Sequence, residues 1–274
     1  CETHPDEAFC RSRNTDRTAL HLATMPGSKC PAPVLLTLLE TNPHAVVVRD
    51  DHRYRGGTPL HFLCGSAQRN NSDVIDRYVQ CALSFEKYNK KYSTASIGTD
   101  DAWSPLLLAA KMSARVETLQ ILVETRSRTL WIAPWTGGES CPGINPLLSE
   151  ADSPLWCLWK YTEAHFADIP EETLPRMRQI AKTMLSDKNA WVQGVSTDTE
   201  QEESWTKLMI LLRVHAQGTL LHTVATLYVP IPGLVRLTAT IFPEQAQEVD
   251  EEGSLALHCF FRCPLDSWEP KHEE

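Results

Sequence analysis

Hydrophobic residues recur along this chain in pairs of short segments that have the spacing of amphipathic helices. The second segment of a pair carries apolar residues three and four positions apart, which places them on one helix face. Such segments contain Val34, Leu35, Leu38 and Leu39; Val74, Ile75, Tyr78 and Val79; Leu119, Leu122 and Val123; and Leu234, Val235 and Leu237. The pattern predicts an all-α chain built from helix pairs.

The first segment of each pair opens with a helix-start signal, which is clearest around Thr58. Gly56 and Gly57 permit a sharp turn because glycine tolerates positive φ. Thr58 suits the N-cap, and Pro59 suits the first helical position, where its missing N–H costs nothing. His61 lies three residues after Thr58, so its side chain can bond back to the cap. A helix is therefore predicted from Pro59 onward.

This start signal recurs along nearly the whole chain. Its first residues are Thr18, Thr58, Ser104, Ser153, Thr219 and Leu255. Recurrence of one helix pair indicates a repeat protein, in which neighbouring repeats stack to bury a continuous core.

The tetrapeptide Thr58 to His61 matches the T-P-L-H motif of the ankyrin repeat in full, and the other five starts match in part. The chain therefore resembles the ankyrin-repeat family over roughly residues 14–263. The family's usual period is about 33 residues, and every interval here is longer, which indicates inserted loops or turns. Such insertions are tolerated because loop-closure entropy grows slowly with loop length.

A second spacing supports the resemblance. Pro43 precedes Asp50 by seven residues, and Pro243 precedes Asp250 by the same interval. Gly253 then follows Asp250, as in the D-x-x-G-x-T form of the family. The resemblance implies a single domain over residues 1–274, an ankyrin-like solenoid of about six stacked helix-turn-helix repeats with inserted loops and helices.

One segment interrupts the periodicity. Residues 196–203 contain no apolar side chain, and we expect a mobile acidic insert over about residues 194–204. We therefore expect Glu202→Ala to be nearly silent, whereas Leu60→Ala should cost about 2–5 kcal/mol as a buried truncation.

The longest uncharged stretch, residues 214–235, has 22 residues without Asp, Glu, Lys or Arg. Pro230, Pro232 and the helix start at Thr219 interrupt it, so a spanning helix is not favoured. Two buried repeat helices are expected there, and no membrane insertion.

Composition narrows the class of partner. A net charge of −9 argues against electrostatic binding of nucleic acid. The nine cysteines form no regular framework, and Cys64, Cys157 and Cys259 lie on apolar sides of helix starts. This usage favours a reducing compartment, cytoplasmic or nuclear. Because the chain begins with Cys1, we expect it to be a fragment of a longer protein.

The residues that could carry chemistry have structural explanations. His21, His61, His222 and His258 recur once per repeat, so they should bond to caps and not converge on a metal. Cys259 and Cys263 lack a second pair of zinc ligands. We find no nucleophile elbow and no phosphate-binding loop. We therefore expect no cofactor, no metal and no catalysis.

The expected function is that of a monomeric protein–protein interaction scaffold. In ankyrin-like arrays the turn tips and the first helices form a concave binding face. By motif position, the expected contact residues are Arg53, Tyr54, Phe62, Lys111, Met112, Lys160 and Tyr161. Basic and aromatic groups suit an acidic or aromatic-bearing protein segment. The alternative is a regulatory or targeting domain of a larger enzyme or signalling protein whose catalytic part lies outside this sequence.

Overall fold

The computed structural model describes residues 10–12, 17–49, 57–66, 70–88, 104–124, 154–186, 198–213, 219–227 and 231–262. These residues are mostly helical and contain no strand, only two isolated bridges, so the all-α prediction is confirmed. The chain divides into two compact units, Cys1–Pro142 and Gly143–Glu274, and each is described by itself. That a single array runs over residues 1–274 stays a prediction.

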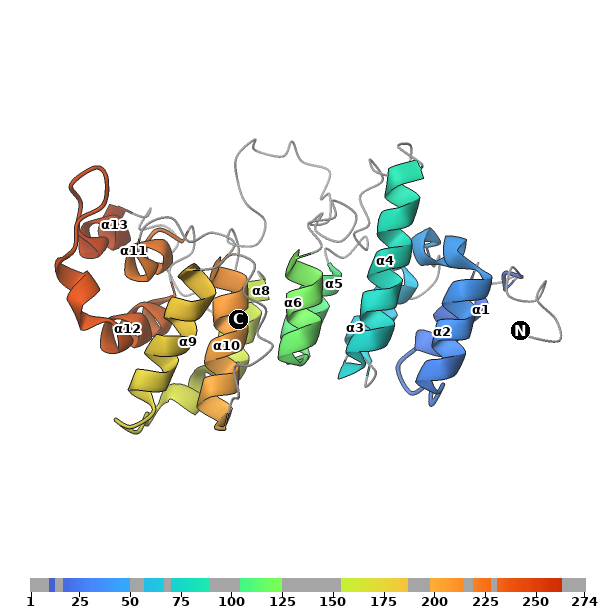
Figure 1. Ribbon diagram of the computed structural model, residues 1–274, viewed down its shortest axis with the longest axis horizontal. Helices are drawn as coiled ribbons and strands as arrows, with labels where there is room; N and C mark the ends of the chain where they lie inside the picture. The colour runs from blue at the N-terminus through green and yellow to red at the C-terminus, as the bar shows by residue number, and fades with distance from the viewer. Residues whose placement is uncertain are drawn as a thin grey trace, which may run out of the picture. The chain divides into compact units, whose positions relative to one another are not determined.

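In its described residues, the first unit contains three helix pairs and one short 3-10 helix. Its elements are α1 (Ala19–Thr24), α2 (Ala32–Thr41), η2 (Pro43–Val47), α3 (Pro59–Gly65), α4 (Ser72–Tyr88), α5 (Pro105–Lys111) and α6 (Val116–Glu124). These helices form two layers. In one layer α3 contacts α1 and α5, and in the other α4 contacts α2 and α6. Figure 1 shows α2, α4 and α6 side by side in the second layer.

The second unit continues with helices of more varied length. Its elements are α8 (Pro154–Thr162), η4 (Glu163–Phe166), α9 (Leu174–Ser186), α10 (Glu200–Arg213), α11 (Leu220–Ala225), α12 (Pro232–Ile241), η5 (Pro243–Gln247) and α13 (Ala256–Arg262). The helix α11 contacts both α12 and α13, and α12 also contacts α9.

Each of six helices begins one residue after a start that the sequence indicated. We call these the motif helices: α1, α3, α5, α8, α11 and α13. The helix that follows and contacts a motif helix is its partner helix: α2, α4, α6 and α12. In the first unit, the motif helices make one layer and their partner helices make the other.

Local hydrogen bonds explain why the motif helices begin at these positions. In α1 and α3 the N-cap threonine and the histidine three residues later form a capping box. In α5 the Ser104 hydroxyl accepts a hydrogen bond from the Leu107 amide at 3.1 Å. Satisfying these otherwise unpaired amides lets short helices start sharply.

The partner helices carry the apolar face that the periodicity predicted. Leu35, Leu39 and Ile75 are fully buried, as is Leu119. The hydroxyl of Tyr78 in α4 donates a hydrogen bond to the Val46 carbonyl in η2, which ties a partner helix to the preceding connection. Burial raises the pKa of Tyr78 well above its ordinary value, so the phenol remains a donor at all ordinary pH values.

Helix α10 is buried on every side over most of its length. All residues from Ser204 to Leu212 are buried, and Trp205 is 0% exposed. The Trp205 indole donates a hydrogen bond to the Met177 carbonyl in α9 at 2.8 Å. Because α10 contacts both α8 and α9, it forms the centre of this part of the second unit.

The expected mobile acidic insert is wrong where the structure describes it. Helix α10 begins at Glu200, and Glu202 is 1% exposed. The Glu202 carboxylate is satisfied by Arg176 of α9, whose Nε lies 3.1 Å from Oε1, and by the Asp198 amide at 2.9 Å. Charge alone therefore does not make this segment a loop, because a distant arginine compensates the buried carboxylate. Residues 194–197 lie outside the described part.

The uncharged stretch at residues 214–235 contains two separate helices, as the sequence indicated. These are α11 and the beginning of α12. Within the described residues, no helix is both long enough and apolar enough to cross a membrane.

Candidate interaction surface

The exposed ends of two motif helices carry four of the predicted contact residues. In the first unit, Lys111 is the last residue of α5 and Met112 is its C-cap. Both are exposed, and Ser113 follows with a φ of +48°. This left-handed residue ends the helix and turns the chain toward α6. The turn therefore presents one cation and one flexible apolar side chain to solvent.

The second unit presents a related pair on α8. Lys160 is exposed and its ammonium lies 5.4 Å from the centre of the Trp156 ring. That distance is within the range of a cation–π interaction. Tyr161 is 60% exposed, unusually high for a large aromatic side chain. Together these residues offer a cation and aromatic rings, and tyrosine and tryptophan are enriched among the residues that carry most of the binding energy at protein interfaces.

Phe62 is wrong as a predicted contact residue. It is 1% exposed and lies between α1 and α3. Its ring meets the His21 ring edge-on at 5.7 Å, and the Arg17 guanidinium lies 5.6 Å from its centre. Phe62 therefore stabilises the contact between neighbouring motif helices and is not available to a partner.

The error at Phe62 is one of register. Lys111 and Lys160 both lie seven residues after their starts, Ser104 and Ser153, whereas Phe62 lies only four after Thr58. Counting seven residues from the starts of α1, α3 and α11 also identifies three positions that the sequence interpretation missed. They are Met25, Gly65 and Thr226, of which Met25 and Gly65 are half-buried and Thr226 is exposed. Arg53 and Tyr54 lie outside the described residues.

The motif histidines bond to helix starts, as predicted. Nδ1 of His61 lies 3.0 Å from the Thr58 amide, and Nδ1 of His21 lies 3.2 Å from the Thr18 amide. His258 makes the same contact with the Leu255 amide at 3.3 Å. The other ring nitrogen of His222 lies 2.9 Å from the Ser254 carbonyl, which precedes the next motif helix. These histidines hold each start in place, and His222 also links its start to the turn before α13.

The turn before α13 is organised by one carboxylate. Asp250 Oδ1 accepts hydrogen bonds from the Ser254 amide at 2.8 Å and the Glu252 amide at 3.0 Å. Its Oδ2 accepts from the Cys259 thiol at 3.5 Å. Above all the Ser254 amide holds the pKa of Asp250 below its ordinary value. Gly253 supplies the positive φ of +76° that this turn requires.

Three hydrogen-bonded side chains, Ser204, His165 and Glu200, have the composition of a catalytic triad. Nδ1 of His165 lies 2.8 Å from the Ser204 hydroxyl, and its Nε2 lies 3.2 Å from the Glu200 carboxylate. The Ser204 side chain, however, is buried in the first turns of α10. A serine hydroxyl buried in this way does not reach a substrate. The three side chains therefore hold η4 against α10.

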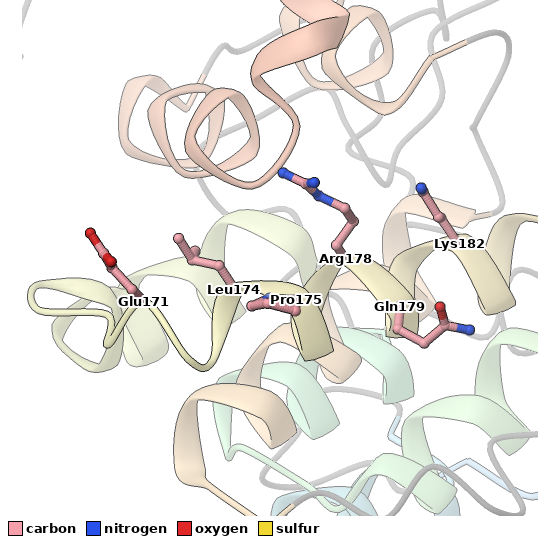
Figure 2. Close-up of a pocket in the computed structure, with 6 residues that line it drawn as sticks. All are labelled: Glu171, Leu174, Pro175, Arg178, Gln179 and Lys182. Atoms are coloured by element: carbon pink, nitrogen blue, oxygen red, sulfur yellow. The ribbon is translucent and has the colours of Figure 1, made fainter.

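A pocket of about 420 Å³ lies along α9 and is lined by Glu171, Leu174, Pro175, Arg178, Gln179 and Lys182. Figure 2 shows Arg178 reaching from α9 toward the neighbouring helix end. There its Nε donates a hydrogen bond to the Ile241 carbonyl at 2.8 Å. This arginine therefore caps the C-terminus of α12, and its role is explained without a ligand in the pocket.

The described residues hold no group of three or more His, Cys, Asp or Glu side chains placed to bind a metal ion. Of the Cys259 and Cys263 pair, only Cys259 is described, and its thiol donates to Asp250.

Comparison with known proteins gives no match to a family model, to a curated protein or to a solved structure.

Proposed function

We propose that this chain is a protein-interaction scaffold built from stacked helix pairs of the ankyrin type. It binds a segment of another protein through the C-terminal ends of its motif helices and the turn tips beside them. The observation that supports this proposal comes from one motif helix in each unit, α5 and α8. In both, the seventh and eighth residues after the start are an exposed lysine and an exposed apolar or aromatic residue. These pairs are Lys111 with Met112, and Lys160 with Tyr161.

The residues just before these pairs are buried. Ala109 and Ala110 are 0% exposed, and so is Leu158. Exposure therefore begins at the same motif position in α5 and α8, and the exposed groups are not a random selection of surface residues. An acidic segment with aromatic side chains suits lysine, thioether and phenol groups together. The net charge of −9 opposes long-range attraction of such a segment, so we expect short-range contacts to dominate.

Affinity capture from a cell extract tests this function when two baits are compared quantitatively by mass spectrometry. One bait is the unaltered chain, and the other carries Lys111→Ala, Lys160→Ala and Tyr161→Ala. A third bait with Lys29→Ala, Lys182→Ala and Val34→Ala removes comparable exposed groups elsewhere. We expect specific proteins to be lost from the second bait alone.

Retention of the same proteins on the second bait would exclude this surface. Absence of specific capture by any bait would favour the alternative, a regulatory or targeting domain that acts on its own parent protein.

A further inference from the structure

The groove along α9 carries positive charge that the fold does not fully neutralise. Lys182 is exposed and, among the described residues, has no hydrogen-bond or ion-pair partner. Arg178 donates from its Nε to the Ile241 carbonyl, but its nearer approach to a carboxylate, that of Glu244, is 3.9 Å, too long for a hydrogen bond. Figure 2 shows Arg178 and Lys182 leaving α9 on the same side. Two cations one helical turn apart therefore remain available to an anionic group.

The other end of the groove has the opposite charge. Glu171 is exposed and, within the part of the chain that the structure describes, has neither a hydrogen-bond nor an ion-pair partner. Leu174, which is half-buried, and Pro175 come between this carboxylate and the cations (Figure 2). The groove thus presents an acidic, an apolar and a basic section in that order. Its volume of about 420 Å³ lies within the range of about 300–1,000 Å³ that is typical of ligand sites.

The spacing of these sections matches an extended peptide. Leu174, Arg178 and Lys182 follow one another at intervals of four residues on α9, so about 6 Å of helix rise separates each from the next. Alternate side chains of an extended strand point to the same side and lie about 6.6 Å apart. A strand that lies along α9 can therefore place every second side chain against one of these three residues.

Charge complementarity selects the sequence of such a strand. Two acidic side chains suit Arg178 and Lys182, because guanidinium and ammonium groups both bind carboxylates. An apolar side chain suits Leu174, and a basic side chain suits Glu171. The order of charges along the groove also gives the strand one direction, since the reverse direction would place like charges together.

We propose that the groove along α9 binds an extended segment of a partner protein in which alternate residues are basic, apolar, acidic and acidic. This site shares no residue with the surface at Lys111 and Lys160, so either proposal can fail without the other. The capture experiment also separates the two sites. Proteins lost only from the third bait, which carries Lys182→Ala, are candidates for the groove, whereas proteins lost only from the second bait bind the first surface.

A designed peptide tests the spacing and the charges directly. The probe is the labelled sequence Lys-Ser-Leu-Ser-Glu-Ser-Glu with blocked ends, and the control peptide has glutamine in place of both glutamates. Fluorescence anisotropy with the full chain should show binding of the probe and binding about tenfold weaker or less of the control, because the control lacks both carboxylates. Added salt should weaken binding of the probe.

Charge reversal at Lys182 distinguishes recognition from a general effect. Lys182→Glu should weaken binding of the probe about tenfold, and a second probe that ends in lysine should bind this variant better than it binds the unaltered chain. Lys29→Glu reverses an exposed charge in the connection between α1 and α2 and should leave binding of both probes unchanged. Urea melts should give equal midpoints for the two variants, because both altered side chains are exposed.

Three results would overturn the proposal. The first is failure of the full chain to bind the probe, or equal binding of the glutamine control. The second is unchanged binding of the probe by Lys182→Glu, or no gain by this variant with the second probe. The third is concentration-dependent self-association that Lys182→Glu abolishes, because the occupant of the groove would then be a second copy of this chain.

Discussion

Gly233 allows α12 to begin directly against the Trp159 ring of α8. A Cβ atom at this position would lie 2.5 Å from Cζ2 of Trp159 and 3.2 Å from its Cε2. The ring is held in place, since it is 4% exposed and stacks on Phe166 with centroids 5.8 Å apart. Only a residue without a side chain fits here.

We predict that Gly233→Ala destabilises the protein by up to about 2 kcal/mol. The overpacking cost of about 1–3 kcal/mol exceeds the helix-propensity gain of roughly 1 kcal/mol. Gly65→Ala is the matched control, because a Cβ there meets nothing within 4 Å. Urea denaturation should show a lower midpoint for the first variant and an equal or higher midpoint for the second. A stabilised Gly233→Ala variant would contradict the described contact with Trp159.

Asp250 gives the second prediction at residue scale. Its pKa is lowered in the folded protein, mainly by the Ser254 amide, so its carboxylate stabilises the fold above about pH 4. That contribution is lost as pH falls through the lowered pKa. Asp250→Asn should therefore reduce stability at pH 7 and narrow the difference from wild type near pH 3. Urea melts at both pH values measure this, with Glu251→Gln controlling for loss of charge from the same turn. If the stability difference between Asp250→Asn and wild type were as large at pH 3 as at pH 7, Asp250 would stabilise the fold without its charge.

At the scale of elements, most helix starts were predictable, whereas the first turn of the inserted helix α10 was not. The starts depend on signals within four residues, such as Thr58, Pro59 and His61, so the sequence contains all that is needed. The beginning of α10 depends on Arg176, which lies far from Glu202 in sequence. Counting charges between residues 196 and 203 could not reveal that tertiary contact.

Glu202→Ala tests the role of that contact. We now expect it to cost about 1–2 kcal/mol, as loss of a helix-start interaction does, and not to be silent. Glu248→Ala is the control, since this exposed residue is the C-cap of η5 and its side chain is on the surface. Equal midpoints for both variants in thermal and urea melts would show that the buried carboxylate does not stabilise α10.

At the scale of the whole chain, the candidate surface was predictable only in part. Motif counting located Lys111, Met112, Lys160 and Tyr161 on exposed helix ends. It misplaced Phe62, because the exposed position depends on where each helix ends and that is decided by burial between neighbours. Counting seven residues from Thr58, the interval that separates Lys111 and Lys160 from their own starts, would have excluded Phe62.

Leu60→Ala tests how far a local defect spreads. Leu60 is 0% exposed in α3, which contacts α1 and α5, and its truncation should cost about 2–5 kcal/mol. In a stack where helices contact only neighbours, the loss should fall mainly on those three helices. Hydrogen exchange should show faster exchange in α1, α3 and α5 and little change in α11 and α12. Leu22→Ala, at a 52% exposed site in α1, is the control. Equal acceleration in both compact units would mean that they unfold together.

The burial of α10 also bears on how this protein is made. A helix with apolar residues on every side has no stable state in water until its surroundings exist. Both helices that surround it, α8 and α9, precede it in the chain. They leave the ribosome first, so a receiving surface is present when α10 emerges. Rearranging the gene so that α10 is translated before α8 and α9 would expose this segment during synthesis and make the nascent chain dependent on chaperones.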